Sequence, residues 1–403
     1  MVTPVTINSA TVGRRNPARH RSVRVGHSWH ASARTAGTEA TLDALQLADP
    51  KLLLVFASFG YDLPELLAGV AAVAGDVPVV GCSTAGEIGP GPALAQGVVV
   101  VCLGGRFAVR TTAVEGLRGR EREVGEAVGH GLVPLPDTAH SIAILLTDSQ
   151  AGDQQEMIRG VYGVLGAGVP LVGGGAGDNN LKIKASYQFH NGQILREAVV
   201  AAVIGSDDPI GLAIRHGWQP SGSGMVVTGS LGNEVHTFDD RPALDVFLER
   251  HGAPAGIERD TQAFVDYTLT RPLAVARRGD SAIRHVVGGD PDARTLRCAG
   301  SVPKGAAAWL ATGDRASTLA AADAVCADAI GQLDGAPLLA LLVFDCAGRR
   351  AVLGDEGVEA ERELIGQRAG DAPVAGFYTY GEIGRTKGVI GYHNQTVLAL
   401  ALS

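Results

Sequence analysis

The chain of 403 residues is long enough for two or three domains, and 46% of its residues are hydrophobic, which allows a sizeable core. It carries 34 basic and 42 acidic residues, a net charge of −8, which argues against general binding to nucleic acid. No apolar run is long enough to cross a bilayer, so we expect no membrane span. Five scattered cysteines without a CxxC pair indicate free thiols in a reducing compartment, and therefore a cytoplasmic location.

Positive charge is concentrated at the start of the chain. Residues 1–38 contain six arginines and no acid, and no apolar stretch follows that would make a signal peptide. We interpret residues 1–22 as a disordered basic tail, with an arm for a membrane or nucleic acid as the alternative. The one close histidine pair, His27 and His30, lies next to this tail, and we expect no metal site.

Further along, a strand–helix–strand pattern recurs. The apolar run 51–56 is typical of a strand that is buried on both faces. Asp62-Leu-Pro-Glu65 then has the spacing of a helix cap with proline in the first turn, and Asp153–Glu156 repeats the cap after a second buried strand. We expect three such units, at 51–103, 141–204 and 338–402.

Two predictions concern strand pairing. Phe107–Thr112 is expected to pair with the strand just before it, 97–103. Asn191-Gly192 is a strong signal for a β-hairpin turn.

The Gly/Ser/Pro-rich stretch 219–224 is the candidate domain boundary. The fold class is therefore α/β, with mixed sheets built from repeated strand–helix–strand units. We expect two related parts, 23–225 and 226–403.

Nearly the same phrase closes two of the apolar strands: PVVGCSTAGEIG at 78–89 and PVAGFYTYGEIG at 373–384. A looser copy, PLVGGGAGD at 170–178, has Asp178 where the others have glutamate. Each copy indicates a buried strand that runs into a tight glycine turn and then a carboxylate. Because ligands of open α/β sheets bind beyond the carboxyl ends of strands, we expect a site at these turns.

The polar side chains at the turns suit a small zwitterion, with carboxylates for an ammonium group and hydroxyls and amides for a carboxylate. The alternative is that the carboxylates only hold their own turns. Glu382 has more aromatic and polar neighbours in sequence than Glu87, so we expect it to matter more for binding. The candidate ligand-binding residues are Thr84, Glu87, Asp178, Tyr378, Thr379, Tyr380, Glu382, His393 and Asn394.

Patterns for other chemistries are weak. The glycines at 173–177 do not fit G-x-G-x-x-G, and no P-loop is present. Ser301-Val-Pro-Lys304 matches S-x-x-K, which is frequent by chance. Cys82 lies on a glycine turn and could be a nucleophile, but the sequence places no base near it. We predict no cofactor, and a Cys82-dependent hydrolase or transferase is the alternative to a binding protein.

Several segments together resemble the FIST sensory family of bacterial proteins, which has an N-terminal and a C-terminal part. The resemblance covers roughly residues 23–403 and implies an intracellular sensory module that binds small ligands such as amino acids. Many relatives are fused to an output domain, for which this chain has no room, so the implied partner is a separate signalling protein. The segments are GCSTAGEI (81–88), GGGAGDN (173–179), VTGSLGNEV (227–235), RPAL (241–244), SVPKG (301–305), GFYTYGEIG (376–384) and HNQT (393–396).

Overall fold

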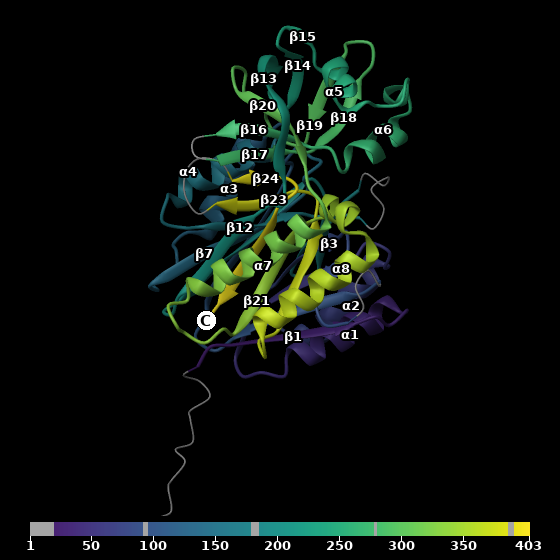
Figure 1. The fold of residues 1–403 in the computed structure, drawn as a ribbon. Helices are drawn as coiled ribbons and strands as arrows, with labels where there is room; N and C mark the ends of the chain where they lie inside the picture. Colours follow the sequence, from purple (N-terminus) through teal and green to yellow (C-terminus); the bar gives the residue numbers. More distant parts are fainter. Residues whose placement is uncertain (1–19, 92–95, 179–184, 278–279, 386–390) are drawn as a thin grey trace, which may run out of the picture.

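The computed structural model describes residues 20–91, 96–178, 185–277, 280–385 and 391–403, and the structural statements below concern these residues. Most of the predicted basic tail lies outside them. Figure 1 shows a larger body with a smaller domain above it. The body holds three mixed sheets with helices packed in pairs, α1 with α2, α3 with α4 and α7 with α8. The mixed α/β class is confirmed.

Three copies of one unit make up the body. Each copy has an outer strand, a helix, a strand, a second helix, the motif strand, one or two short strands after the motif turn, and a returning antiparallel strand. The first unit consists of β1 (Ser22–Ser28), α1 (Ala33–Ala44), β2 (Pro50–Ser58), α2 (Leu63–Ala74), β3 (Val79–Thr84), β4 (Glu87–Ile88) and β5 (Val98–Gly104). The second consists of β6 (Ala108–Glu115), α3 (Glu121–Leu132), β7 (His140–Thr147), α4 (Gln154–Leu165), β8 (Leu171–Gly175), β9 (Gln188–His190), β10 (Gln193–Leu195) and β11 (Ala198–Ser206). The third consists of β12 (Ile210–Arg215), α7 (Arg315–Gly331), β21 (Ala340–Cys346), α8 (Ala347–Ala369), β22 (Val374–Thr379), β23 (Glu382–Arg385), β24 (Tyr392–His393) and β25 (Val397–Leu402).

The smaller domain is inserted into the third unit, between its outer strand and its first helix. We call residues 219–312 the inserted domain. Its sheet has the order β17-β16-β20-β13-β14-β19-β18, with β15 paired to β14. Residue 225, where the sequence suggested a boundary, lies within β13. The elements are β13 (Gln219–Leu231), β14 (Glu234–Phe238), β15 (Arg241–Pro242), α5 (Ala243–His251), η2 (Ile257–Arg259), α6 (Thr261–Thr268), β16 (Leu273–Arg277), β17 (Asp280–Arg284), β18 (Val286–Asp290), β19 (Thr295–Cys298) and β20 (Ala307–Thr312).

Sheet register confirms the repeat that the three motifs predicted. The motif strands β3, β8 and β22 run parallel to β2, β7 and β21. Gly81, Gly173 and Gly376 hold the same position in this register. A Cβ at any of the three would clash with the backbone carbonyl of the neighbouring strand. This close approach is why each motif has glycine there.

The units exchange strands in a closed ring. After its motif turn, the first unit gives β4 to β22 of the third unit, the third gives β23 to β8 of the second, and the second gives β9 to β3 of the first. Each motif strand has a strand of its own unit on one side and a strand from another copy on the other side. No unit therefore completes its own sheet. The ring therefore brings the three motif turns into one region of the body.

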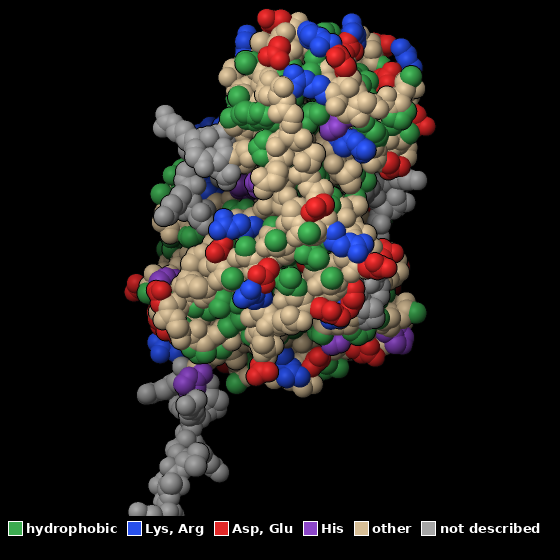
Figure 2. All heavy atoms as spheres, in the orientation of Figure 1, with side chains coloured by type: hydrophobic (Ala, Val, Ile, Leu, Met, Phe, Trp, Pro, Cys, Tyr) green, Lys and Arg blue, Asp and Glu red, His purple; other side chains and the backbone are tan. Residues whose placement is uncertain are grey.

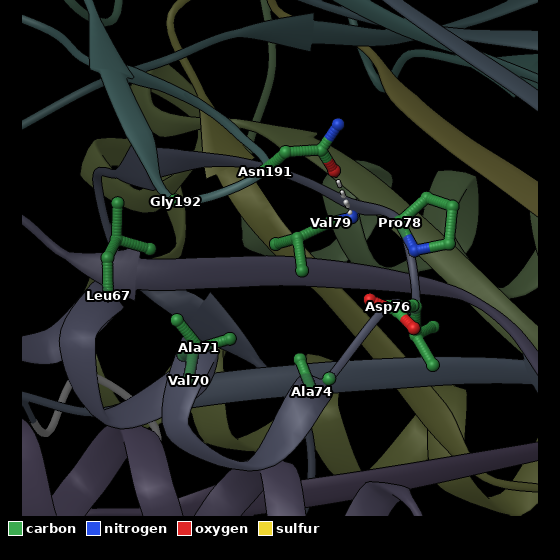
Figure 3. A pocket seen from close by; sticks show the side chains of 11 residues that line it. Leu67, Val70, Ala71, Ala74, Asp76, Pro78, Val79, Asn191 and Gly192 are labelled. Atoms are coloured by element: carbon green, nitrogen blue, oxygen red, sulfur yellow. Dashed lines mark hydrogen bonds between the residues drawn. The ribbon is translucent and has the colours of Figure 1, made fainter.

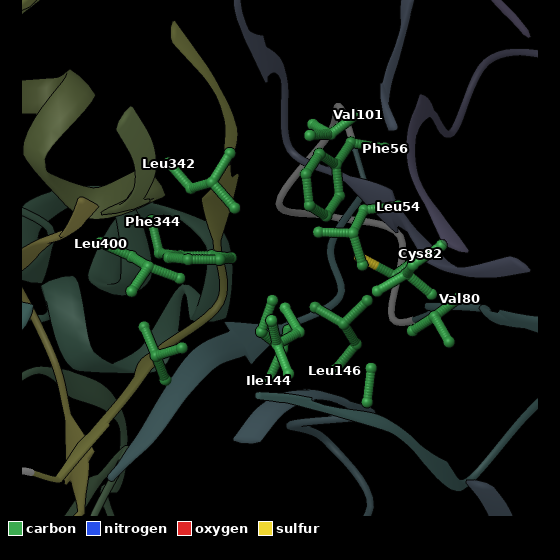
Figure 4. Packing of buried hydrophobic residues seen from close by; sticks show 14 of the residues in the cluster. Leu54, Phe56, Val80, Cys82, Val101, Ile144, Leu146, Leu342, Phe344 and Leu400 are labelled. Carbon is green, nitrogen blue, oxygen red and sulfur yellow. The ribbon is translucent and has the colours of Figure 1, made fainter. Parts of the chain in front are cut away.

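A single apolar cluster lies between the three sheets and joins the units. Figure 4 shows Phe56 and Cys82 of the first unit, Leu146 of the second and Phe344 of the third turned toward one another. All four are completely buried. Burying a large aliphatic or aromatic side chain contributes about 1.5–3 kcal/mol, so this cluster adds substantially to the cohesion between the units.

Helix starts follow the capping pattern in the sequence. Asp62 accepts a hydrogen bond from Glu65 N at the start of α2, and Asp153 accepts from Gln155 N and Glu156 N at the start of α4. Each of these bonds satisfies a backbone donor that the helix itself leaves free. Both predicted caps are confirmed.

The predicted pairing of Phe107–Thr112 with the preceding strand is wrong. β6 pairs with β11, and β5 pairs with β1 and β2. β6 opens the second unit, so its partner is the strand that closes that unit. The Asn191-Gly192 hairpin between β9 and β10 is confirmed.

Candidate functional site

The three motif turns contact one another through their backbones. Each turn donates one N–H to a carbonyl of the next turn around the ring, and the three bonds are equivalent in the repeat. They run from Ala85 N to Tyr378 O (3.1 Å), from Tyr380 N to Gly175 O (3.0 Å) and from Gly177 N to Ser83 O (3.0 Å).

In the first turn, Glu87 accepts hydrogen bonds from Thr84 Oγ1 and from Ser58 Oγ (3.2 Å). Burial raises the pKa of Glu87 to about 8. The two hydrogen bonds favour the charged form and oppose this rise, but burial has the larger effect. Thr84 is completely buried, whereas Glu87 is only partly buried as a whole residue. Thr84 and Glu87, two of the predicted site residues, are therefore bonded to each other, and both carboxylate oxygens of Glu87 have partners.

The third turn repeats this arrangement. Glu382 Oε1 accepts from Thr379 Oγ1 (2.5 Å), and Oε2 accepts from Thr396 N (3.1 Å) and Thr396 Oγ1 (2.7 Å). Burial raises the pKa of Glu382 to about 7, again opposed by its hydrogen bonds. Glu382 is completely buried, and these partners tie the turn to the start of β25.

The second turn differs from the prediction. Sheet register pairs Glu87 with Phe377, Glu382 with Gly174 and Gln188 with Cys82, so Gln188 and not Asp178 is the counterpart of the two glutamates. The second turn is longer, which displaces Asp178 from that position. Asp178 Oδ1 instead accepts from Tyr380 OH (2.7 Å), which joins the second turn to the third.

Tyr378 and Arg350 join the first and third turns. The Arg350 guanidinium lies 5.1 Å from the centre of the Tyr378 ring and donates to Ala85 O. Burial raises the pKa of Tyr378 well above its usual value. These groups hold the turns together and leave Tyr378 little exposed.

His393 and Asn394 lie at the edge of this region that faces the inserted domain. His393 Nε2 donates to Gly384 O (2.8 Å). Asn394 is 2% exposed, and its Oδ1 has no hydrogen-bond partner among the described residues. A buried polar atom without a partner costs about 1–3 kcal/mol, so Asn394 departs from the rule for protein interiors.

Gln395, next in sequence, joins the body to the inserted domain and was not predicted as a site residue. Its Nε2 donates to Leu269 O (2.9 Å), and its backbone carbonyl accepts from Trp218 Nε1 (3.2 Å). The backbone is left-handed, with φ of 59°, and Oε1 has no partner in the described part of the chain. Its place inside HNQT was the one sequence signal that pointed to it.

On the other side of this junction, Arg284 and His285 come from the inserted domain. Arg284 Nε donates to Ser301 O (2.9 Å) and Nη1 to Ile283 O (3.0 Å). Burial lowers the pKa of Arg284 and lowers that of His285 to about 4, so His285 is neutral at neutral pH. Gln395 Nε2 lies 3.5 Å from His285 Nδ1. We call Arg284, His285, Asn394 and Gln395 the junction.

A separate surface hollow of about 250 Å³ lies between α2 and the β9–β10 hairpin (Figure 3). It is lined mainly by apolar side chains, among them Leu67, Val70 and Pro78, and Asn191 Oδ1 beside it accepts from Val79 N (2.9 Å). Val79 begins β3 and the motif turn follows its end, so this hollow is remote from the predicted site.

Other classes of site find little support in the described residues. Burial raises the pKa of the Cys82 thiol well above its usual value, and its side chain lies in the central core. Among these residues no three His, Cys, Asp or Glu side chains are placed to hold a metal ion. Within the same ranges, no helix is both long enough and apolar enough to cross a membrane.

Comparison with known families now decides the relationship. The FIST N domain profile matches residues 51–241 and the FIST C domain profile matches residues 243–385. The chain belongs to the FIST family. FIST domains are associated with sensory signal transduction and small-ligand binding. The two matched regions meet inside the inserted domain, between β14 and α5, so they do not correspond to the body and the inserted domain.

Known relatives of this FIST protein are distant. An uncharacterised protein of Mycobacterium tuberculosis is 27% identical over 268 residues, which are 64% of this chain and 67% of that protein. An uncharacterised protein of Mycobacterium bovis is 30% identical over 192 residues, 45% of this chain and 48% of that protein. An uncharacterised protein of Methanocaldococcus jannaschii is 28% identical over 81 residues, 20% of this chain and 16% of that protein.

Proposed function

We propose that this FIST protein is a cytoplasmic sensor that binds an amino acid or similar small polar metabolite at the junction and signals to a separate partner. One observation carries the proposal: Asn394 Oδ1 and Gln395 Oε1 are buried side by side in sequence with no hydrogen-bond partner in the described chain. Both oxygens are acceptors, which suits a ligand with an ammonium or other N–H group. The five free cysteines support a reducing compartment.

The junction is also where binding could change the shape of the protein. Gln395 is hydrogen-bonded to Leu269 of the inserted domain and to Trp218, which directly precedes that domain, and its left-handed backbone is a conformation that non-glycine residues adopt at some cost. A ligand that donates hydrogen bonds to the side-chain oxygens of Asn394 and Gln395 would favour one placement of the inserted domain over others. That difference in placement is the signal we propose for the partner.

Among the predicted site residues, Asn394 is the one that we propose as a direct ligand contact. The carboxylates of Glu87, Asp178 and Glu382 have partners within the protein, as have the hydroxyls of Thr84, Thr379 and Tyr380. We propose that these groups fix the shape of the turns that carry Asn394. Tyr378 and His393 belong to the same supporting set.

The alternative of a Cys82-dependent enzyme is less well supported. A nucleophilic cysteine needs a partly exposed thiol with a lowered pKa and a base within reach. Cys82 is completely buried among the apolar side chains of the central core, and burial raises its pKa. Alkylation of Cys82 by a substrate-like electrophile in the folded protein would favour the enzyme again.

A mass-spectrometric survey of metabolites that co-purify with the full chain tests the function. The enriched metabolite is then measured by calorimetry against the wild type and Asn394→Leu, which has nearly the same shape without the amide. We expect binding at least about tenfold weaker, since a lost hydrogen bond to a polar ligand costs about 1–3 kcal/mol.

Gln154→Leu is the matched control, because the Gln154 amide is also buried but is fully hydrogen-bonded inside the body. Its affinity should match that of the wild type. Failure to enrich any metabolite over an unrelated protein, or equal affinity of Asn394→Leu and wild type, would refute the proposed site.

A further inference from the structure

The described part of the chain contains three buried arginines, and two of them have no acidic partner. Arg349 forms ion pairs with Asp345 and Glu361. Arg284 and Arg385 are each 4% exposed, and neither forms an ion pair with a described side chain. Among the side chains that the structure does not describe, the only acid is Asp280, at the opposite end of β17 from Arg284. Burying a cation without a counter-charge costs several kcal/mol, so proteins rarely do it outside functional sites.

Surface arginines of the same protein are treated differently. Figure 2 shows basic and acidic side chains interspersed over α7 and α8. On these helices Arg368 pairs with Asp323, and Arg362 pairs with Glu359. Acids thus pair with many of the exposed arginines, where each pair contributes little, but with neither of these two buried ones among the described side chains.

Local contacts only partly compensate the two charges. Arg284 donates to two backbone carbonyls, and Asp153, a carboxylate whose charge acts on it, is engaged in capping α4. The guanidinium of Arg385 lies 3.2 Å from the centre of the Tyr162 ring, and its Nε has no partner among the described residues. An aromatic face attracts a cation but does not neutralise it.

Both arginines lie on strands next to β24, which carries Tyr392. One strand belongs to the inserted domain and the other to the body. Arg385 is on β23, which pairs with β24 through Ile383 and Tyr392. Arg284 ends β17, which packs against β24 as Figure 1 shows, and its charge acts on Tyr392. Arg284 thus comes from the inserted domain and Arg385 from the body, with Asn394 two residues beyond Tyr392.

We infer that the ligand carries an oxyanion, a carboxylate or a phosphate, which Arg284 recognises from the inserted domain and Arg385 from the body. This inference rests on the proposed function, since it names the chemistry of the ligand at the same place. Guanidinium groups bind carboxylate and phosphate oxygens through paired N–H donors, which lysine cannot do in the same geometry. Binding supplies the counter-charge that the chain lacks and draws the inserted domain toward the body.

The test uses thermal shift and calorimetry on the full chain, with the metabolite from the survey and with L-glutamate, succinate, acetate and inorganic phosphate as probes. Each carboxylate is compared with its amide, which has the same shape without the charge. If the carboxylates bind and phosphate does not, the oxyanion is a carboxylate. If phosphate binds and the carboxylates do not, it is a phosphate. Sodium chloride at equal ionic strength shows whether any anion is sufficient.

Arg284→Gln and Arg385→Gln remove the charge and keep a donor. Arg271→Gln is the matched control, because Arg271 also stacks on a tyrosine, 3.9 Å from the Tyr267 ring centre, but is partly exposed. We expect at least one oxyanion to bind, at least tenfold more weakly to Arg284→Gln and Arg385→Gln, and unchanged to Arg271→Gln. The amide of that ligand should not bind.

Three results would overturn the inference. A neutral or cationic ligand whose affinity survives both arginine substitutions would leave the proposed function in place and remove the oxyanion. Equal stabilisation by chloride and by every probe would show an unselective anion effect only. Failure of every metabolite and probe to bind would refute both the proposed function and this inference.

Discussion

The ion cluster around Arg349 and the junction around Arg284 both bury an arginine, and each leaves some polar atoms without a hydrogen-bond partner among the described residues, but only the first pairs its buried charge with acids. Arg349 lies between Asp345 and Glu361 and also donates to Thr318 O (2.9 Å). Burial alone would lower the pKa of Arg349, and the two carboxylates reverse this and raise it. Burial also raises the pKa of Asp345 well above its usual value.

At the junction the same kind of groups lack such partners. Arg284 has only backbone carbonyls, and Asn394 Oδ1 and Gln395 Oε1 have no partner among the described residues. The difference teaches how to separate structural from functional polar groups within one protein. A cluster whose buried charges are paired stabilises the fold, whereas a buried charge without a counter-charge implies a partner that is not part of the chain.

Replacing Arg349 tests the completed side of this comparison and should have the largest effect. Arg349→Met leaves Asp345 and Glu361 buried without their counter-charge. We expect the free energy of unfolding to fall by about 3–5 kcal/mol, measured by urea denaturation.

Arg284→Met is the control for that experiment, because it strands no carboxylate. Relief of the uncompensated charge and loss of two hydrogen bonds to carbonyls oppose each other, so we expect a change within about 1 kcal/mol. A loss as large as that of Arg349→Met would show that Arg284 is a structural residue.

Glu382 allows a test by pH. Its pKa is raised from 4.5 to about 7 in the folded protein, mainly by burial. The folded state therefore holds this proton more tightly, so its contribution to stability is present below about pH 4.5 and is lost as pH rises through 7. Since one pKa unit corresponds to about 1.4 kcal/mol, the loss is at most about 3.5 kcal/mol.

The Glu382→Gln variant has no titrating group at this position. Glu87 is present in both proteins, so its contribution to the pH dependence cancels in the comparison. The wild type should lose stability relative to Glu382→Gln between pH 5 and pH 8, in urea denaturation at each pH. Parallel pH profiles would show that the carboxyl of Glu382 is not held in its protonated form by the fold.

Much of the body could be predicted from local sequence, because its signals are local. Apolar strands, aspartate caps and the glycine turns each follow from a few adjacent residues, and Gly81 and Gly376 mark places where two backbones approach closely. The exchange of β4, β9 and β23 between units could not be predicted in this way. Pairing between strands far apart in sequence depends on the whole assembly, and the longer second turn hid the equivalence of Gln188 with the glutamates.

The candidate site was predicted only in part, for a related reason. Motif residues such as Thr379 and Glu382 attract attention by their repetition, yet they are engaged in holding the turns. Arg284 and Gln395 have no such signal, since their significance lies in burial and in absent partners, which a sequence does not show. None of the motifs taken from the sequence lies between residues 245 and 300, the stretch that contains Arg284.

Gln154 represents a smaller completed site. Its Oε1 accepts from Thr147 Oγ1 (2.9 Å), and its Nε2 donates to Asp148 O (3.0 Å) and Gly152 O (3.3 Å). Gln154→Leu removes the amide and leaves these three groups without their partner. We expect a loss of about 1–3 kcal/mol in the free energy of unfolding, measured in urea.

Asn394→Leu should have the smallest effect on the ligand-free protein. Asn394 and Gln154 are each 2% exposed, so the two substitutions remove amides of equal burial and differ in what the amides bind. The Asn394 carbonyl has no hydrogen bond to lose in the described protein, so the substitution removes only the hydrogen bond between the Asn394 side chain and Tyr392. We expect a change within about 0.5 kcal/mol without ligand, together with the weaker binding described above. A loss equal to that of Gln154→Leu would mean that Asn394 is already satisfied within the fold, and the junction would then belong with the completed clusters.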